Sequence, residues 1–341
     1  MMLALVSALG ASTLSAQSTG ATYLLVVSGA GGEPAYKEQF FSLGARLASA
    51  ATARLGVPAA NVTFLAEDSV RAPARGRSSR AGLERALADL AARARADDRL
   101  VVVLIGHGSA TGGVPRFNLP GPDVSAAELK AMLAPFNART IAVVNTSSAS
   151  GDWVQVLSGP GRVVIAATRT GYEGNATTFP RHFVDALAGD VADVDKDGAV
   201  SLLEAFDYAK REVARAYEAD NRLLTEHAIL DDDGDGKGTN QPANRGEGDG
   251  ALARRVAFRA GASAAAVAAA ATSATASDAT LRALYASRDS IQRRVESLRG
   301  RKATMPEAQY DRELEPLMVA LARTSRAIRE RESAKAGGTA P

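Results

Sequence analysis

The sequence contains no cysteine. This absence excludes disulfide bonds, thiolate nucleophiles and metal sites with cysteine ligands. Aromatic residues are also few, at 5% of the chain, with a single tryptophan. Acidic and basic side chains nearly cancel, 38 against 40, which leaves a formal net charge of +2. Because nucleic-acid binders usually carry a basic surplus, we expect no nucleic-acid partner.

The N-terminal segment has the composition of an export signal. Residues 1–10 are mainly apolar, and small residues suited to signal-peptidase cleavage follow as far as Ala16. We interpret residues 1–16 as a signal peptide and expect a periplasmic or extracellular protein. No basic residue precedes the apolar run, so a start further upstream and a buried N-terminal segment remain as alternatives. No later stretch is long enough to span a bilayer, and no transmembrane segment is expected after the signal peptide.

Apolar runs typical of buried strands alternate with segments of helical periodicity. The predicted strands are 23–28, 62–65, 100–105, 140–144 and 162–167. The predicted helices are 38–55, 80–94, 126–133, 179–187 and 202–217. This alternation predicts an α/β domain at 20–258, with a mostly parallel sheet and helices on both of its faces.

Polar clusters follow two of the predicted strands. His107 and Gly108 come after the apolar run 100–105, and Ser147 and Ser148 come after the strand 140–144. Ligand sites in parallel sheets form beyond the carboxyl ends of the strands. The sequence therefore predicts a functional site at this edge of the sheet.

The two strand ends together resemble the caspase, legumain and gingipain superfamily of cysteine peptidases. In that family one buried strand ends in His-Gly, and a second ends in a short Asp-Ala-Cys-x-Ser-Gly-like segment. The corresponding segments here are 101–108 and 141–151, and the resemblance covers about residues 22–258. It is strongest to the bacterial legumain-like members, of the C13 type. The resemblance implies a caspase-like α/β/α sandwich.

The resemblance also implies roles for individual residues. His107 would be the general base or acid, and the backbone N–H of Gly108 would contribute to an oxyanion hole. The nucleophile position falls on Ser148 when it is counted back from the Ser-Gly pair at 150–151. Counted from the strand end, it falls on Ser147. We prefer Ser148, and in either case serine stands where the family has its cysteine.

Serine at this position determines which activities of the family this chain could have. A thiol ionises readily, whereas a serine hydroxyl needs a base that removes its proton and a third group that holds the base. Asp123 and Asp152 are candidates for that third group by proximity in the sequence. We expect no cysteine-peptidase activity. Two functions remain open: a calcium-stabilised module that binds a peptide or protein, and a serine-dependent hydrolase that uses His107 and Ser148.

A twelve-residue segment at 193–204 matches the calcium loop of an EF-hand. Gly198 falls at the sixth position, where such loops turn sharply, and both flanks have helical periodicity. The oxygen ligands are expected from Asp193, Asp195, Asp197, the carbonyl of Ala199, Ser201 and Glu204. The sequence therefore predicts bound Ca²⁺.

A weaker copy of this pattern follows later in the chain. Asp231, Asp233 and Asp235 have the spacing of the first three ligands, but Pro242 occupies the twelfth position, where a carboxylate is needed. Two interpretations remain open: a partial calcium site completed from elsewhere, and a plain acidic loop.

The composition changes beyond residue 258. Residues 259–277 are rich in alanine and serine and are predicted to be a linker. Residues 278–333 carry apolar positions at the spacing of a coiled coil and predict a helical hairpin, with a kink at Pro316. Two helices bury little surface, so we expect the hairpin to dock on its own domain, on a second copy or on a partner. Residues 334–341 are predicted to be disordered.

Overall fold

The structure is a computed structural model that describes residues 20–189, 191–194, 198–243, 248–259 and 305–336. It also describes Thr280, Leu284, Ser287, Ser290, Ile291, Arg294 and Leu298. The chain divides into two compact units, Met1–Gly261 and Ala262–Pro341. The predicted signal peptide and nearly all of the predicted linker lie outside the described residues.

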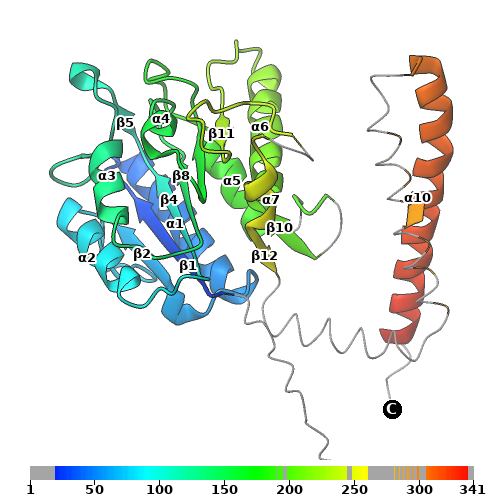
Figure 1. Ribbon diagram of the computed structural model, residues 1–341, viewed down its shortest axis with the longest axis horizontal. Helices are drawn as coiled ribbons and strands as arrows, with labels where there is room; N and C mark the ends of the chain where they lie inside the picture. The colour runs from blue at the N-terminus through cyan, green and yellow to red at the C-terminus, as the bar shows by residue number, and fades with distance from the viewer. Residues whose placement is uncertain are drawn as a thin grey trace, which may run out of the picture. The chain divides into compact units, whose positions relative to one another are not determined.

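A seven-stranded sheet forms the centre of the first unit, in the order β11-β9-β8-β4-β1-β2-β3 (Figure 1). Its strands are β1 (Thr22–Ser28), β2 (Val62–Ala66), β3 (Gly76–Arg77), β4 (Arg99–Ile105), β8 (Thr140–Asn145), β9 (Arg162–Ala166) and β11 (Ile229–Asp231). Each neighbouring pair is parallel except β11 and β9, which are antiparallel. The prediction of a mostly parallel sheet is therefore confirmed.

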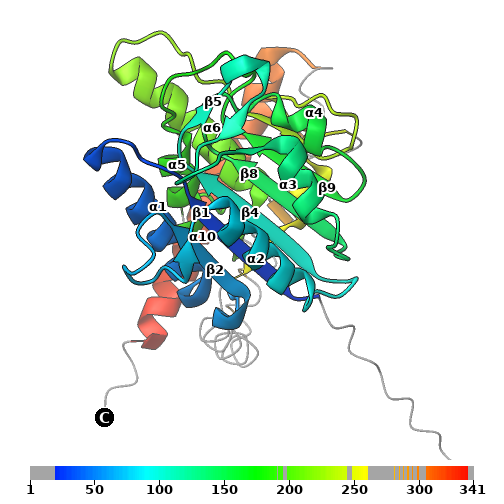
Figure 2. The same ribbon diagram turned by 90° about the vertical axis from the view of Figure 1, so that its left-hand side faces the viewer.

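Helices cover both faces of this sheet, because successive side chains of each apolar strand point to opposite faces. One face packs on α1 (Pro34–Ala53), α5 (Phe179–Ala188), α6 (Leu202–Ala219) and α7 (Ala251–Arg255). The other packs on α2 (Arg80–Ala91), α3 (Ala126–Leu133) and α4 (Trp153–Leu157). Figure 2 shows α2 and α3 in front of the sheet, with α1 to their left. The predicted three-layer α/β arrangement is confirmed.

Serine residues cap the starts of three of these helices. The hydroxyl of Ser79 accepts a hydrogen bond from the backbone of Gly82 at the start of α2. Ser125 caps the start of α3 and Ser201 caps the start of α6, each in a reciprocal capping box with the glutamate three residues later. These caps fix where the three helices start.

Two smaller sheets accompany the central one. The first consists of β5 (Gly108–Ser109), β6 (Arg116–Phe117) and β7 (Val124–Ser125). It is formed by the segment that follows β4 in the chain. The second pairs β10 (Ala199–Ser201) with β12 (Ala257–Arg259). Short 3-10 turns, η1 (Ala59–Asn61) and η2 (Thr111–Gly113), complete the described elements of this unit.

The second unit contains the long helix α10 (Glu307–Ala336), which includes Pro316. Leu298, Tyr310 and Leu317 are buried together, with Ile291, Met305 and Leu314 packed against them. The docking partner of this unit stays a prediction. In the part of the chain that the structure describes, no helix combines the length and the apolar character needed to cross a membrane.

Candidate functional site

The carboxyl ends of β4 and β8 bring the two sequence motifs together. These strands are parallel neighbours, with Leu104 opposite Asn145. Just beyond them, the backbone N–H of Gly108 donates to Oγ of Ser148 over 3.1 Å. The same hydroxyl donates to the carbonyl oxygen of Gly108 over 3.0 Å. The residue that follows His107 is therefore in direct contact with the preferred nucleophile position.

This contact requires glycine at position 108. A Cβ atom there would collide with the carbonyl oxygen of Ser148 and would lie 2.8 Å from Oγ of Ser147. Such close approach of two backbones is possible only without a side chain. The Gly108 contact with the serine loop is thus set by packing as well as by hydrogen bonding.

Ser147 has a different environment. Its hydroxyl donates to Oδ1 of Asn145 over 2.7 Å, and its backbone N–H donates to the same atom. Ser147 and Ser148 are both buried, with 1% and 3% of their surface exposed. Within the described part of the chain, neither hydroxyl forms a hydrogen bond with His107. Of the two hydroxyls, that of Ser148 is therefore bonded to the residue next to His107, and that of Ser147 is bonded to Asn145 within its own loop.

The loop that carries both serines is held firmly. Ala149 has a φ of +54°, a left-handed conformation that costs a residue with a Cβ atom about 1–2 kcal/mol. Its backbone N–H donates to the carbonyl oxygen of Glu173 over 2.9 Å. Oγ1 of Thr168 accepts from the backbone of Ser150 and Gly151, over 2.8 and 3.0 Å. Surrounding structure thus fixes this strained turn.

The imidazole of His107 packs against two aromatic rings of α1. Its centroid lies 4.5 Å from that of Tyr36 and 4.9 Å from that of Phe40, both in edge-to-face geometry. Burial lowers the pKa of His107, and the negative charge of Glu33 partly opposes this. The imidazole is therefore neutral at pH 7. Among the described residues, neither ring nitrogen has a hydrogen-bond partner.

The acidic residues suggested by sequence proximity have other contacts. Oδ1 of Asp123 accepts from the backbone of Leu119 over 3.0 Å. Asp152 lies beside Gly171. The acidic side chain that acts on the pKa of His107 is Glu33. Sequence reasoning missed Glu33 and the aromatic pair, although Tyr36 and Phe40 have the spacing of neighbours on one helix face.

Exposed apolar side chains lie on two loops that adjoin the serine turn. Val114 is 45% exposed and Tyr172 is 96% exposed. The loops meet, because a Cβ atom on Gly171 would lie 3.2 Å from Cγ of Pro115. The second loop also contacts the turn directly, through the bond from Ala149 to the Glu173 carbonyl. Two exposed apolar side chains thus lie on loops that adjoin the candidate site.

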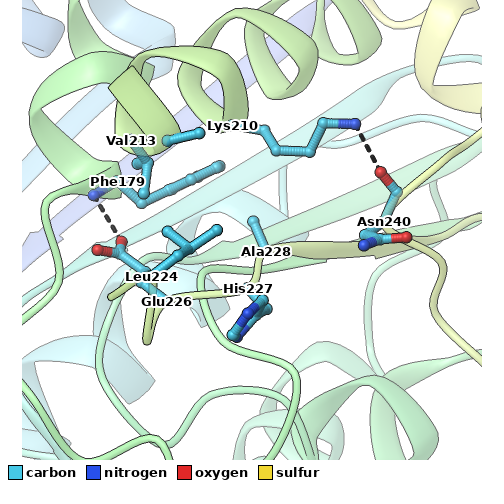
Figure 3. Close-up of a pocket in the computed structure, with 9 residues that line it drawn as sticks. Phe179, Lys210, Val213, Leu224, Glu226, His227, Ala228 and Asn240 are labelled. Atoms are coloured by element: carbon cyan, nitrogen blue, oxygen red, sulfur yellow. Dashed lines mark hydrogen bonds between the residues drawn. The ribbon is translucent and has the colours of Figure 1, made fainter. Parts of the chain in front are cut away.

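A cavity of about 150 Å³ lies between α5, α6 and the segment before β11 (Figure 3). Its wall includes Glu226, whose carboxylate accepts from the backbone of Phe179 over 2.7 Å. Burial raises the pKa of Glu226. His227, also in the wall, bonds through Nδ1 to Glu173 over 3.0 Å. The polar groups of this cavity therefore support the start of α5 and the loop around Glu173.

The predicted calcium loop is only partly described, since Asp195 and Asp197 lie outside the described residues. Gly198 has a φ of +82°, as the sixth position requires, and its N–H donates to Oδ2 of Asp193 over 3.2 Å. Oδ1 of Asp193 is buried and has no hydrogen-bond partner among the described residues. Glu204 reaches back to accept from the backbone of Val194 over 3.1 Å. The described residues of this loop fit a calcium ion.

The strand β10 contains the two other expected ligands, Ala199 and Ser201. It pairs with β12, and Val200 at its centre is buried opposite Phe258. The three aspartates of the weaker motif also lie together, because one carboxylate oxygen each of Asp231, Asp233 and Asp235 lies within 4.8 Å of the other two.

Comparison with known proteins gives little beyond this geometry. No protein-family model matches the chain, and no curated protein matches it. Among solved structures, the chain is similar to the crystal structure of caspase-1 from Spodoptera frugiperda. The TM-score is 0.41 and the sequence identity 10%, over 63% of this chain and 87% of that chain.

Proposed function

We propose that this chain has a caspase-like peptidase fold, of the legumain type, whose carboxyl edge binds a peptide or protein segment without cleaving it. One observation carries the proposal: the Ser148 hydroxyl is bonded to the Gly108 backbone through both its donor and its acceptor roles. No cysteine is present to supply a thiolate.

Hydrolysis by Ser148 would need a base within hydrogen-bond reach of its proton. His107 is neutral and so has the protonation state of a base, but its ring packs on Tyr36 and Phe40. The proton of Ser148 instead points to the Gly108 carbonyl. This arrangement supports a binding role over an activated nucleophile.

The surface around the site supports peptide binding. Tyr172 and Val114 expose large apolar side chains on the two loops that meet beside the serine turn. Aromatic side chains on a rigid scaffold are typical anchors of protein interfaces. We therefore assign Tyr172 as the principal contact for a bound segment.

A pool of fluorescein-labelled decapeptides of randomised sequence tests this function by fluorescence anisotropy. We expect binding that weakens at least about tenfold in Tyr172→Ser, the loss of one anchor residue. Val70→Ser is the matched control, because Val70 is 94% exposed on the loop after β2 and should bind like wild type. Equal binding by Tyr172→Ser, or peptide cleavage that requires Ser148, would overturn the proposal.

We also propose that the loop at 193–204 binds Ca²⁺ and stabilises the fold. Asp193 and Glu204 both turn a carboxylate toward the backbone of this loop, Asp193 at Gly198 and Glu204 at Val194, and a cation would relieve the repulsion among the acidic side chains of the loop. A ligand bound only to the folded state adds about 2.7 kcal/mol at a hundredfold excess over Kd.

Thermal melting in millimolar calcium and in EGTA checks this claim. Wild type should melt at a higher temperature in calcium, and Glu204→Gln should lose part of the difference. Equal melting temperatures for wild type in the two buffers would contradict a stabilising ion.

Export is proposed from the apolar segment at 1–16. A weak calcium site fills outside the cell, where the ion is at millimolar levels. N-terminal sequencing of the mature protein from a periplasmic or culture fraction should begin at Gln17. A full-length chain found in the cytoplasm would refute export.

A further inference from the structure

The acidic turn after β11 contains a buried carboxylate that lacks a full set of partners. Asp231 has no exposed surface. Its Oδ1 accepts from Oγ of Ser158 over 2.9 Å, whereas Oδ2 has no hydrogen-bond partner among the described residues. Leaving a buried anionic oxygen unpaired is costly. One carboxylate oxygen each of Asp231, Asp233 and Asp235 lies within 4.8 Å of the other two. A bound cation would offset the repulsion between these carboxylates.

The turn has a left-handed glycine at the position where a calcium loop has one. Gly236 occupies the sixth position from Asp231 and has a φ of +76°, close to the +82° of Gly198 in the first loop. Two backbone hydrogen bonds between Leu230 and Thr239, of 2.8 and 2.9 Å, close the turn at its base. Left-handed glycine at this position lets such loops turn their oxygens inward.

The described basic side chains do not neutralise the cluster. Lys237 approaches Asp235 to 3.8 Å, but its side chain is 85% exposed. An ion pair at this distance and exposure contributes little, about 0–1 kcal/mol. Oδ2 of Asp231 is buried, and Lys237 forms no hydrogen bond with it.

A fourth carboxylate, outside this group of three, contacts the backbone of the turn from the segment before α7. Asp232 points away from the cluster, and its carboxylate accepts from the backbone of Gly250 and Ala253, over 2.8 and 2.6 Å. This anchor brings Asp249 against the turn, where Oδ1 of Asp249 accepts from the Asp232 backbone over 2.8 Å. Burial, and then the charges of Asp233 and Asp231, raise the pKa of Asp249 to about 6.

We propose that Asp231, Asp233 and Asp235 bind a second Ca²⁺, and that Asp249 supplies the acidic group that Pro242 cannot supply at the twelfth position. An all-oxygen ligand set suits calcium, whose coordination geometry is variable. Magnesium demands a stricter octahedron and retains its water more strongly.

The ion has a structural consequence for the candidate site. Ser158 ends α4, and its hydroxyl bonds to Asp231. A Cβ atom on Gly236 would lie 3.7 Å from Cα of Gln155 within the same helix. The helix α4 begins at Trp153, five residues after Ser148. Calcium in this turn therefore braces the helix that follows the serine loop.

Calorimetric titration of the full chain with CaCl₂, after dialysis against EGTA, tests the proposal in a Glu204→Gln background that disables the first loop. We expect this background to bind one ion. Adding Asp233→Asn and Asp235→Asn should abolish binding, and adding Asp249→Asn alone should weaken it about tenfold or more. The control adds Asp89→Asn and Asp220→Asn, which remove the same charge from exposed sites, and should bind like its parent.

Hydrogen exchange gives a second measurement, which should respond only to calcium bound in this turn. Calcium should slow exchange of the amides at 153–158 in Glu204→Gln, and this slowing should disappear with Asp233→Asn and Asp235→Asn. A Glu204→Gln chain that binds no calcium would overturn the proposal, as would binding that survives the loss of Asp233 and Asp235. Either result leaves the peptide-binding function untouched.

Discussion

Gly108→Ala is the substitution that most directly tests the contact between the two motifs. A methyl group at this position would collide with the backbone carbonyl of Ser148 and approach Oγ of Ser147 to 2.8 Å. A backbone atom cannot rotate away as a side chain can, so the serine turn must shift. Gly108 does not have a positive φ, so alanine itself fits the local backbone.

The expected loss of stability follows from two contributions. Overpacking in a close-packed region costs about 1–3 kcal/mol. The two hydrogen bonds between Gly108 and Ser148 contribute about 0.5–1.5 kcal/mol each, and a shift of the turn weakens both. We therefore expect Gly108→Ala to lower the free energy of unfolding by about 2–4 kcal/mol.

Urea denaturation followed by circular dichroism measures this difference, provided that the m-values of the variants agree. Gly174→Ala is the matched control, because a Cβ atom there meets no atom within 4 Å. Its stability should stay within about 0.5 kcal/mol of wild type. Equal stability of Gly108→Ala and Gly174→Ala would refute the close approach of the two motifs.

Three further predictions concern single side chains. In an NMR titration the pKa of His107 should lie below its ordinary value, and Glu33→Gln should lower it further. The lowered pKa of His107 means that the native state binds fewer protons than the unfolded chain as the pH falls below about 6.5. The contribution of His107 to stability is therefore fully present above about pH 6.5 and is lost as the pH falls. Glu226→Gln should cost about 1–3 kcal/mol in urea unfolding, since it weakens the hydrogen bonds at the start of α5, and an unchanged midpoint would contradict this. Ala149→Gly should be tolerated, whereas Ala149→Val should cost more than about 2 kcal/mol at this buried left-handed residue, and equal stabilities would show that the turn is unstrained.

The sequence was sufficient to predict the layers of the first unit. The apolar run at 100–105 became β4 (Arg99–Ile105), and the cap at Ser79 gave the start of α2. These features depend on local periodicity and capping, which can be recognised directly in the sequence. The antiparallel edge strand β11 was not predicted, because three residues beside an acidic turn have too little pattern.

The candidate sites were harder to predict from the sequence than the layers of the fold. Parallel pairing of two predicted strands was enough to place His107 near the serine turn. The direction of its ring could not be predicted, because the rings of Tyr36 and Phe40 reach it from a helix 67–71 residues earlier. Asp249 was missed for a similar reason, since only the folded contacts of Asp232 bring it to the second acidic turn.

The central claim is that the carboxyl edge binds without cleaving, and a fluorophosphonate probe tests it most directly. Wild type and Ser148→Ala are incubated with the probe at pH 7.5, and covalent labelling is read by intact-mass spectrometry. The Ser148 hydroxyl donates to the Gly108 carbonyl and has no bond to His107 among the described residues, so it is not activated. We expect no labelling of either protein. Labelling of wild type that disappears in Ser148→Ala would identify a serine hydrolase and contradict the account.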